Sequence, residues 1–204
     1  MGAPIRLGVL GGTFDPPHYG HLTLAETARV QMGLERVLFV PAGEPPHKPD
    51  RPITPVSCRV AMVKAAIADN PAFALSRADL ERPGPHYTVD MLDCLHREHP
   101  DAELVFLLGG DGLAEFLSWR DPAGILRQAR LGAMRRPGWE TDPAALEQAL
   151  PGIDERLTWL DVPLLHISGS DLRRRARLGL PLRYLLPPAV EAIIRERGLY
   201  VDRR

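Results

Sequence analysis

The sequence predicts an α/β protein, a Rossmann-like open parallel sheet with helices on both faces. Short apolar segments alternate with segments of helical spacing through the first half of the chain. Such alternation is typical of βαβ units that build a parallel sheet. A loop rich in glycine and proline directly follows the first apolar segment. In open parallel sheets, ligands bind beyond the carboxyl ends of the strands, which is where this loop is expected.

In the first half of the chain, each strand is a short apolar run bounded by turn residues. These strands are expected at residues 5–10, 36–40, 73–76 and 103–108. The helices have apolar residues at helical spacing, and we expect them at 22–32, 57–68 and 88–98. Ser57 and Thr88 have the side-chain oxygens that cap helix N-termini, so we expect them to cap the second and third helices.

The second half of the chain is less regular. Segments that open with proline, which suits the first turn of a helix, are expected to be helical at 122–128, 143–150 and 188–197. A last strand is expected at 164–167, leading into a helix that starts near Ser170. Neither an internal repeat nor a linker divides the chain. We therefore expect a single domain over residues 1–204, with a helical C-terminal portion from about 168 to 204.

Composition excludes several functional classes. The net charge of −1 provides no general attraction to nucleic acid or to membranes. No apolar stretch approaches the roughly 20 residues of a membrane helix, and no signal peptide is evident. Two scattered cysteines do not make a disulfide framework. We expect a cytoplasmic protein that binds neither nucleic acid nor membrane.

The loop after the first strand has the residues of a phosphate site. Gly11 and Gly12 let backbone N–H groups approach a phosphate closely. His18 and His21 lie three residues apart at the start of the next helix, so they share one face, and Gly20 leaves room between them. Two imidazoles at a helix N-terminus can donate hydrogen bonds to charge that develops on a transferring phosphoryl group. The alternative is a tight turn with two surface histidines.

A second candidate site follows the last apolar segment. Ser168 and Ser170 stand at an expected helix start, where hydroxyl groups can cap the helix and bind a phosphate. Arg173, one turn later, can bind the same anion through two parallel hydrogen bonds. The alternative is a capped helix with a solvated basic face.

Together these segments resemble a known family. The run GGTFDPPHYGHL at 11–22 is similar to the signature of the nucleotidyltransferases related to class I aminoacyl-tRNA synthetases, and within them to nicotinate-nucleotide adenylyltransferases. The run at 167–175 resembles the family motif Ile-Ser-Ser-Thr-x-Ile-Arg-x-Arg, except that Gly169 replaces its second serine and Ser170 replaces its threonine. The resemblance implies a nucleotidyltransferase fold. It also implies an ATP site formed by Gly11, Gly12, Thr13, Phe14, His18, His21, Asp111, Arg136, Ser168, Ser170 and Arg173.

The residues between the two motifs extend the resemblance to a second substrate. They imply a mononucleotide site formed by Asp15, Lys48, Thr88, Trp119 and Arg120, with the indole of Trp119 stacked on a pyridine ring. Asp111 could instead cap a helix. Whether Arg135 or Arg136 meets ATP stays open. His18, His21, Lys48 and Arg173 are expected to be the catalytic residues.

The expected reaction transfers AMP from ATP to nicotinate mononucleotide, giving nicotinate adenine dinucleotide and pyrophosphate in NAD biosynthesis. No dedicated cluster of carboxylates is evident, so Mg²⁺ is expected to be carried with ATP. The alternatives are nicotinamide mononucleotide or phosphopantetheine as the acceptor, CTP as the donor, or a non-catalytic nucleotide sensor. The sequence leaves open whether the chain forms a homo-oligomer.

Overall fold

The computed structural model describes residues 4–43, 53–135 and 142–201. In these residues six parallel strands form one sheet in the order β3-β2-β1-β4-β5-β6. The strands are β1 (Ile5–Gly12), β2 (Arg36–Pro41), β3 (Phe73–Leu75), β4 (Ala102–Leu108), β5 (Ala129–Met134) and β6 (Leu157–Leu160). The strand order reverses between β1 and β4, so a crevice opens beyond their carboxyl ends.

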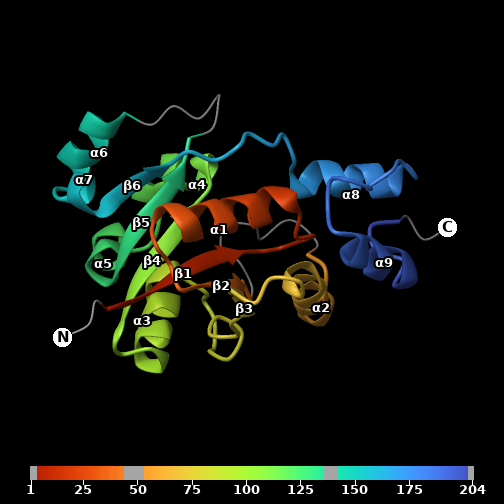
Figure 1. Ribbon diagram of the computed structural model, residues 1–204, viewed down its shortest axis with the longest axis horizontal. Helices are drawn as coiled ribbons and strands as arrows, with labels where there is room; N and C mark the ends of the chain where they lie inside the picture. The colour runs from red at the N-terminus through yellow and green to blue at the C-terminus, as the bar shows by residue number, and fades with distance from the viewer. Residues whose placement is uncertain (1–3, 44–52, 136–141, 202–204) are drawn as a thin grey trace.

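Helices cover both faces of the sheet, as the sequence predicts (Figure 1). Along β1 the side chains alternate: Leu7 and Val9 belong to one apolar core cluster and Leu10 to the other. The cluster with Leu10 contains residues of α1 (Tyr19–Gln31), α2 (Val56–Ile67), α8 (Gly169–Arg177) and α9 (Pro188–Glu196). The other cluster contains residues of α3 (Thr88–Glu98), α4 (Gly110–Ala114), η1 (Phe116–Ser118), α5 (Pro122–Gln128), α6 (Pro143–Ala149) and α7 (Ile153–Arg156).

The C-terminal helices lie at one end of the molecule. In Figure 1 they are blue and lie beside α2, and α9 packs against α2. The amide of Tyr19, the first residue of α1, donates to the carbonyl of Leu185 at 3.2 Å. The C-terminal portion therefore contacts the start of α1, near the carboxyl end of β1. None of the helices in the described ranges combines the length and the apolar composition needed to span a bilayer.

The expected strand at 164–167 is wrong. This segment pairs with no strand in the described residues, the N–H of Ile167 donates back to the carbonyl of Leu165, and Leu164 and Leu165 are 50% and 39% exposed. The edge of the sheet is formed instead by β6, which the sequence analysis missed together with β5. β5 contains small residues that give little strand signal. Gly132 stands there because a Cβ at this position would lie 2.8 Å from the sulfur of Met32.

Two expected helix caps are also wrong. α2 begins at Val56 after Pro55, so Ser57 lies within its first turn and caps nothing. α3 begins at Thr88 itself, with Tyr87 in the extended conformation before it. In both cases the helix starts earlier than expected. Pro55 and Tyr87 are the residues that precede the helices, so Ser57 and Thr88 already lie inside them.

Candidate active site

A cavity of about 620 Å³ opens at the crevice between β1 and β4, a size typical of pockets for small molecules. Its walls come from the loop after β1, the turn after β4, the start of α3 and the N-terminus of α8. Every predicted site residue that the structure describes lines it: Gly11, Gly12, Thr13, Phe14, Asp15, His18, His21, Thr88, Asp111, Trp119, Arg120, Ser168, Ser170 and Arg173. Two further predicted residues, Lys48 and Arg136, lie outside the described residues.

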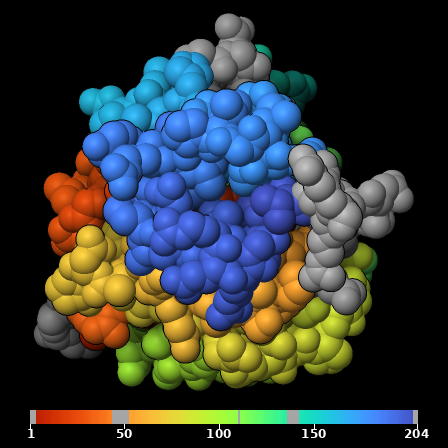
Figure 2. All heavy atoms as spheres, turned by 90° about the vertical axis from the view of Figure 1, so that its right-hand side faces the viewer, coloured from red at the N-terminus to blue at the C-terminus, as the bar shows by residue number. Residues whose placement is uncertain are grey.

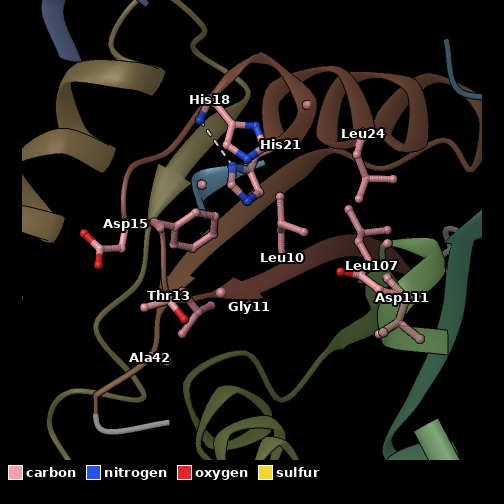
Figure 3. Close-up of a pocket in the computed structure, with 18 of the residues that line it drawn as sticks. Leu10, Gly11, Thr13, Asp15, His18, His21, Leu24, Ala42, Leu107 and Asp111 are labelled. Atoms are coloured by element: carbon pink, nitrogen blue, oxygen red, sulfur yellow. Dashed lines mark hydrogen bonds between the residues drawn. The ribbon is translucent and has the colours of Figure 1, made fainter. Parts of the chain in front are cut away.

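The two histidines form one stacked unit on this wall. Their ring centroids are 3.8 Å apart at an interplanar angle of 29°, and Figure 3 shows the rings side by side. The backbone N–H of His18, the residue that precedes α1, donates to Nδ1 of His21 at 3.2 Å. Because Nδ1 accepts this bond, the neutral ring carries its proton on Nε2.

His21 is held neutral by its surroundings. Burial lowers the pKa of its imidazole to about 4. The ring of Phe14 meets it edge to face, with centroids 5.1 Å apart, and Phe14 itself is buried. Near pH 7 His21 therefore offers a neutral N–H donor rather than a positive charge.

Gly20 controls the position of the other imidazole. A Cβ at residue 20 would lie 3.0 Å from both Cε1 and Nδ1 of His18, which is closer than most side chains tolerate. The space that the missing side chain leaves beside the helix start is thus occupied by the buried His18 ring.

The N-terminus of α8 forms the neighbouring wall. The hydroxyl of Ser168 accepts from the N–H of Asp171 at 3.2 Å and caps the helix, as the sequence predicts. Arg173 donates from Nη2 to Ser170 Oγ at 2.8 Å and from Nη1 to the carbonyl of Asp15. This wall therefore combines a positive helix end with a fixed guanidinium group.

The opposite end of the cavity has an aromatic lining. Trp119 is half-buried between Phe106 and Phe116, with centroids 6.0 and 5.7 Å away. The guanidinium of Arg120 lies 5.4 Å from the ring centroid of Tyr87, the residue before Thr88. A supported indole beside a cation can receive a flat, polar ring.

Asp111 lies in the first turn of α4, whose N-cap is Gly109. The alternative in which Asp111 caps this helix is therefore wrong. Its exposed carboxylate stands at the carboxyl end of β4, across the cavity from the histidines (Figure 3). Arg135, left open as an ATP contact, places its guanidinium 4.4 Å from the ring centroid of Trp159 and is outside the cavity wall.

A buried arginine ties the loops of the site together. Arg59 is 1% exposed and donates to the carbonyls of Thr13, Ala42, Gly43 and Thr54 at 2.8–3.0 Å. Burial lowers the pKa of this guanidinium, and the nearby Asp15 opposes that effect. Arg59 thus joins the ends of β1 and β2 to the start of α2.

A second buried network lies beside the aromatic end and was missed. The carboxylate of Asp79 accepts from Arg82 at 2.7 Å and from the N–H of Gly43 at 3.0 Å. Nδ1 of His86 lies 3.6 Å from the same carboxylate, and Arg82 also donates to the carbonyl of Tyr87 at 3.0 Å. The network fixes the approach to Thr88. The sequence offered little signal for it, because Asp79 stands in no recognisable motif.

The described residues contain no group of three or more His, Cys, Asp or Glu side chains arranged to hold a metal ion. Asp15 contributes little to such a site, because its two carboxylate oxygens accept hydrogen bonds from Thr54 and Tyr200.

Comparison with known proteins agrees with this geometry. The family model described as cytidylyltransferase-like matches residues 9–175. The probable nicotinate-nucleotide adenylyltransferase of Thermomicrobium roseum is 49% identical over 195 residues, which cover 96% of this chain and 91% of that protein. The protein of the same name from Moorella thermoacetica is 44% identical and covers 98% of this chain and 94% of its own length.

Solved structures show the same fold. The Plasmodium falciparum nicotinic acid mononucleotide adenylyltransferase complexed with NaAD superimposes with a TM-score of 0.77. The match covers 96% of this chain and 97% of that one at 19% sequence identity. The nucleotidyltransferase fold that the motifs imply is therefore confirmed.

Proposed function

Since this chain is an enzyme of the nicotinate-nucleotide adenylyltransferase family, we propose that its cavity transfers AMP from ATP to nicotinate mononucleotide. The products are nicotinate adenine dinucleotide and pyrophosphate, and the reaction belongs to NAD biosynthesis. One observation carries the assignment of the site. The stacked histidines at the start of α1, the capped N-terminus of α8 and Arg173 all line one cavity, and Arg173 contacts the loop that carries the histidines.

The triphosphate of ATP lies between these two helix ends in our proposal. Both N-termini favour anions, and backbone N–H groups of the loop after β1 can reach phosphate oxygens. Arg173, with its two donors already oriented by Asp15 and Ser170, binds the β- and γ-phosphates. Lys48 and Arg136 are predicted from the sequence to add positive charge there.

The reaction needs no covalent enzyme intermediate. An oxygen of the mononucleotide's 5′-phosphate attacks the α-phosphorus of ATP, and the bond from that phosphorus to the β-phosphate oxygen breaks. The electron pair leaves with pyrophosphate, and the nucleophile is already ionised, so no proton has to be removed. Catalysis then consists of alignment and of stabilising charge on the triphosphate.

The histidines supply hydrogen bonds to that charge. His21, neutral with its proton on Nε2, donates without having to gain or lose a proton during turnover. Mg²⁺ bound to the phosphates would neutralise part of the charge on the leaving pyrophosphate. Asp111, at the end of β4, is the side chain we propose to meet the ribose hydroxyls or the phosphate-bound cation.

The pyridine ring of the mononucleotide is proposed to stack on Trp119, with Thr88 and Arg120 at its polar edge. The support is the half-buried indole, held by two phenylalanine rings on the cavity wall. We further propose a cytoplasmic enzyme that acts on ATP and nicotinate mononucleotide and binds neither nucleic acid nor membrane. Its oligomeric state is left to measurement.

The deciding experiment measures pyrophosphate release with Mg-ATP and three acceptors in parallel: nicotinate mononucleotide, nicotinamide mononucleotide and phosphopantetheine. We expect a strong preference for the nicotinate form. Preference for either other acceptor would keep the chemistry but refute the assignment of Trp119 and Thr88. Replacing ATP with CTP tests the cytidylyltransferase alternative. ATP binding without pyrophosphate release from any acceptor would identify a nucleotide sensor.

A further inference from the structure

A chain of hydrogen bonds links the C-terminal segment to the triphosphate end of the cavity. The Tyr200 hydroxyl donates to Asp15 Oδ1 at 2.6 Å. The N–H of Thr54 donates to the other carboxylate oxygen at 3.3 Å. The backbone carbonyl of Asp15 accepts from Nη1 of Arg173, whose Nη2 donates to Ser170 at 2.8 Å. Asp15 therefore holds the tyrosine with its side chain and the arginine with its main chain.

The carboxylate of Asp15 points away from the two imidazoles, as Figure 3 shows. It is 5% exposed, and both of its oxygens accept hydrogen bonds from protein groups. The Arg59 guanidinium interacts with its charge from within the protein. These contacts favour a role in which Asp15 shapes the loop rather than one in which its carboxylate binds substrate.

Tyr200 is suited to hold that carboxylate permanently. Burial, and then the hydrogen bond to Asp15, raise the pKa of its phenol. The hydroxyl therefore keeps its proton and remains a donor at neutral pH. Hydrogen bonds to ionised acceptors are roughly twice as strong as neutral ones.

The joint between Asp15 and Arg173 is closely packed. A Cβ at Gly169 would lie 3.2 Å from the carbonyl oxygen of Asp15 and 3.2 Å from Nη1 of Arg173. Gly169 is the position at which this chain departs from the serine of the family motif. The missing side chain lets the first turn of α8 approach the Asp15 carbonyl, so a small shift of Asp15 moves Arg173 as well.

Tyr200 also has a plain structural role. It packs against the core cluster that includes α2 and α9, and its hydroxyl lies 3.9 Å from the sulfur of Met62. Figure 2 shows the blue C-terminal segment covering this end of the molecule beside the orange α2. The ring alone could supply that packing. The hydroxyl, in contrast, reaches the loop of the active site.

We infer that Tyr200 is a positioning residue for the triphosphate site: through Asp15 its hydroxyl fixes the carbonyl that orients the Arg173 guanidinium. The hydrogen bonds from Tyr200 to Asp15 and from Arg173 to Asp15 do not depend on which reaction the protein catalyses. The expected kinetic effect, in contrast, rests on the proposed function. Displacing a binding group by about an ångström can lower the reaction rate by a large factor. The effect should therefore fall on ATP and not on the acceptor.

The test is Tyr200→Phe, which keeps the ring and removes the hydroxyl. Tyr184→Phe is the matched control, because Tyr184 is 84% exposed. For each variant, KM is measured for ATP and for nicotinate mononucleotide, together with kcat. Calorimetry measures the Kd of a non-hydrolysable ATP analogue, and a thermal scan measures Tm. The Tyr200 variant should weaken analogue binding and kcat/KM for ATP about tenfold, with the acceptor KM changed less than twofold.

A purely structural role predicts a different pattern. Loss of folded protein lowers the apparent kcat in proportion to the inactive fraction and leaves both KM values and the analogue Kd unchanged. That result would overturn the inference. So would an equal effect in the Tyr184 control.

A double mutant tests the route through Arg173. In Arg173→Lys, the Tyr200→Phe substitution should have little further effect on analogue binding, because the orienting contact is already lost. Fully multiplicative effects would show that Tyr200 acts by another route. If the wild type releases no pyrophosphate, the proposed function fails, but the analogue-binding measurements still decide the role of Tyr200.

Discussion

Two imidazoles stacked 3.8 Å apart cannot both be charged without strong repulsion. In the proposed reaction the pair therefore works through oriented N–H groups, and the positive charge comes from arginine and from helix ends. The protonation state of the two rings can be measured in the free protein. Each ring can also be removed separately by mutation.

Removing one ring should reduce turnover far more than stability. We expect His18→Ala to lower kcat by roughly 100-fold, the usual cost of losing one preorganised donor to a transition state. Steady-state kinetics and a thermal scan give the two quantities. His99→Ala is the control, because His99 lies between α3 and the amino end of β4 and does not line the cavity. A fall in Tm that accounts for the whole loss of activity would contradict the assigned role.

The lowered pKa of His21 predicts a particular dependence of stability on pH. The folded-state pKa is about 4 and the ordinary value is 6.5, so between these values the unfolded chain binds more protons. The stabilisation due to the neutral ring is therefore complete above pH 6.5 and is lost as pH falls towards 4.

Proton NMR of the free protein should show the His21 ring titrating with a midpoint near 4, its signal identified by its absence in His21→Gln. Urea unfolding should show wild type losing more stability than this variant between pH 6.5 and 4. A midpoint near 6.5, or parallel unfolding profiles, would contradict the burial argument.

At the scale of elements, the start of α8 has two separable tasks. The Ser168 hydroxyl caps the helix, and the same helix end is proposed to bind phosphate. Ser168→Ala should cost about 1 kcal/mol of unfolding free energy and raise the KM for ATP several-fold.

Asp142 provides the matched control for this prediction. Its carboxylate caps α6 by accepting from the N–H of Ala144 at 2.9 Å, and it does not line the cavity. Asp142→Ala should cause a similar loss of stability in urea unfolding with no change in KM. If the two alanine variants have the same KM for ATP, the hydroxyl at α8 has no role in binding.

The sequence predicted helices and strands correctly where the local side-chain pattern agreed with the place of the segment in the fold. β1, β2 and β4 are apolar runs in the centre of the sheet, and the Pro-initiated helices α5, α6 and α9 lie close to their expected ranges. β5 and the segment at 164–167 failed for opposite reasons. β5 is a strand because its neighbours pack on its small residues, while Leu164 and Leu165 have strand-like side chains but no strand beside them.

The active site shows the same division. Gly11 to His21 and Ser168 to Arg173 stand in recognisable local motifs, so their residues could be named from the sequence. Tyr200 donates to Asp15, 185 positions away in the sequence, and Asp79 accepts from the N–H of Gly43, 36 positions away. No local pattern marks such pairs. Their positions became evident only from the packed structure.

At the scale of the whole molecule, Arg59 is the main tie between the loops. It satisfies four backbone carbonyls from three segments of the chain. Arg59→Leu leaves these buried acceptors without their donor, so we expect a loss of roughly 3 kcal/mol or more. For a domain of this size that corresponds to a fall in Tm of about 6–12 °C.

Calorimetry or a thermal scan measures this fall. Arg97→Leu is the control, because Arg97 forms an exposed ion pair with Asp93 and should shift Tm by no more than about 2 °C. If Tm falls no further in Arg59→Leu than in Arg97→Leu, the hydrogen bonds of Arg59 do not stabilise the loops.

The contact between Asp15 and Arg173 joins residues 158 positions apart in the sequence. During synthesis the N-terminal half of the sheet can form while the chain is still growing, but α8 is among the last segments to leave the ribosome. We therefore expect a chain that ends before α8 to lack the Arg173 contact and to be unable to consume ATP. The catalytic residues near the N-terminus gain their partner only when synthesis is almost complete.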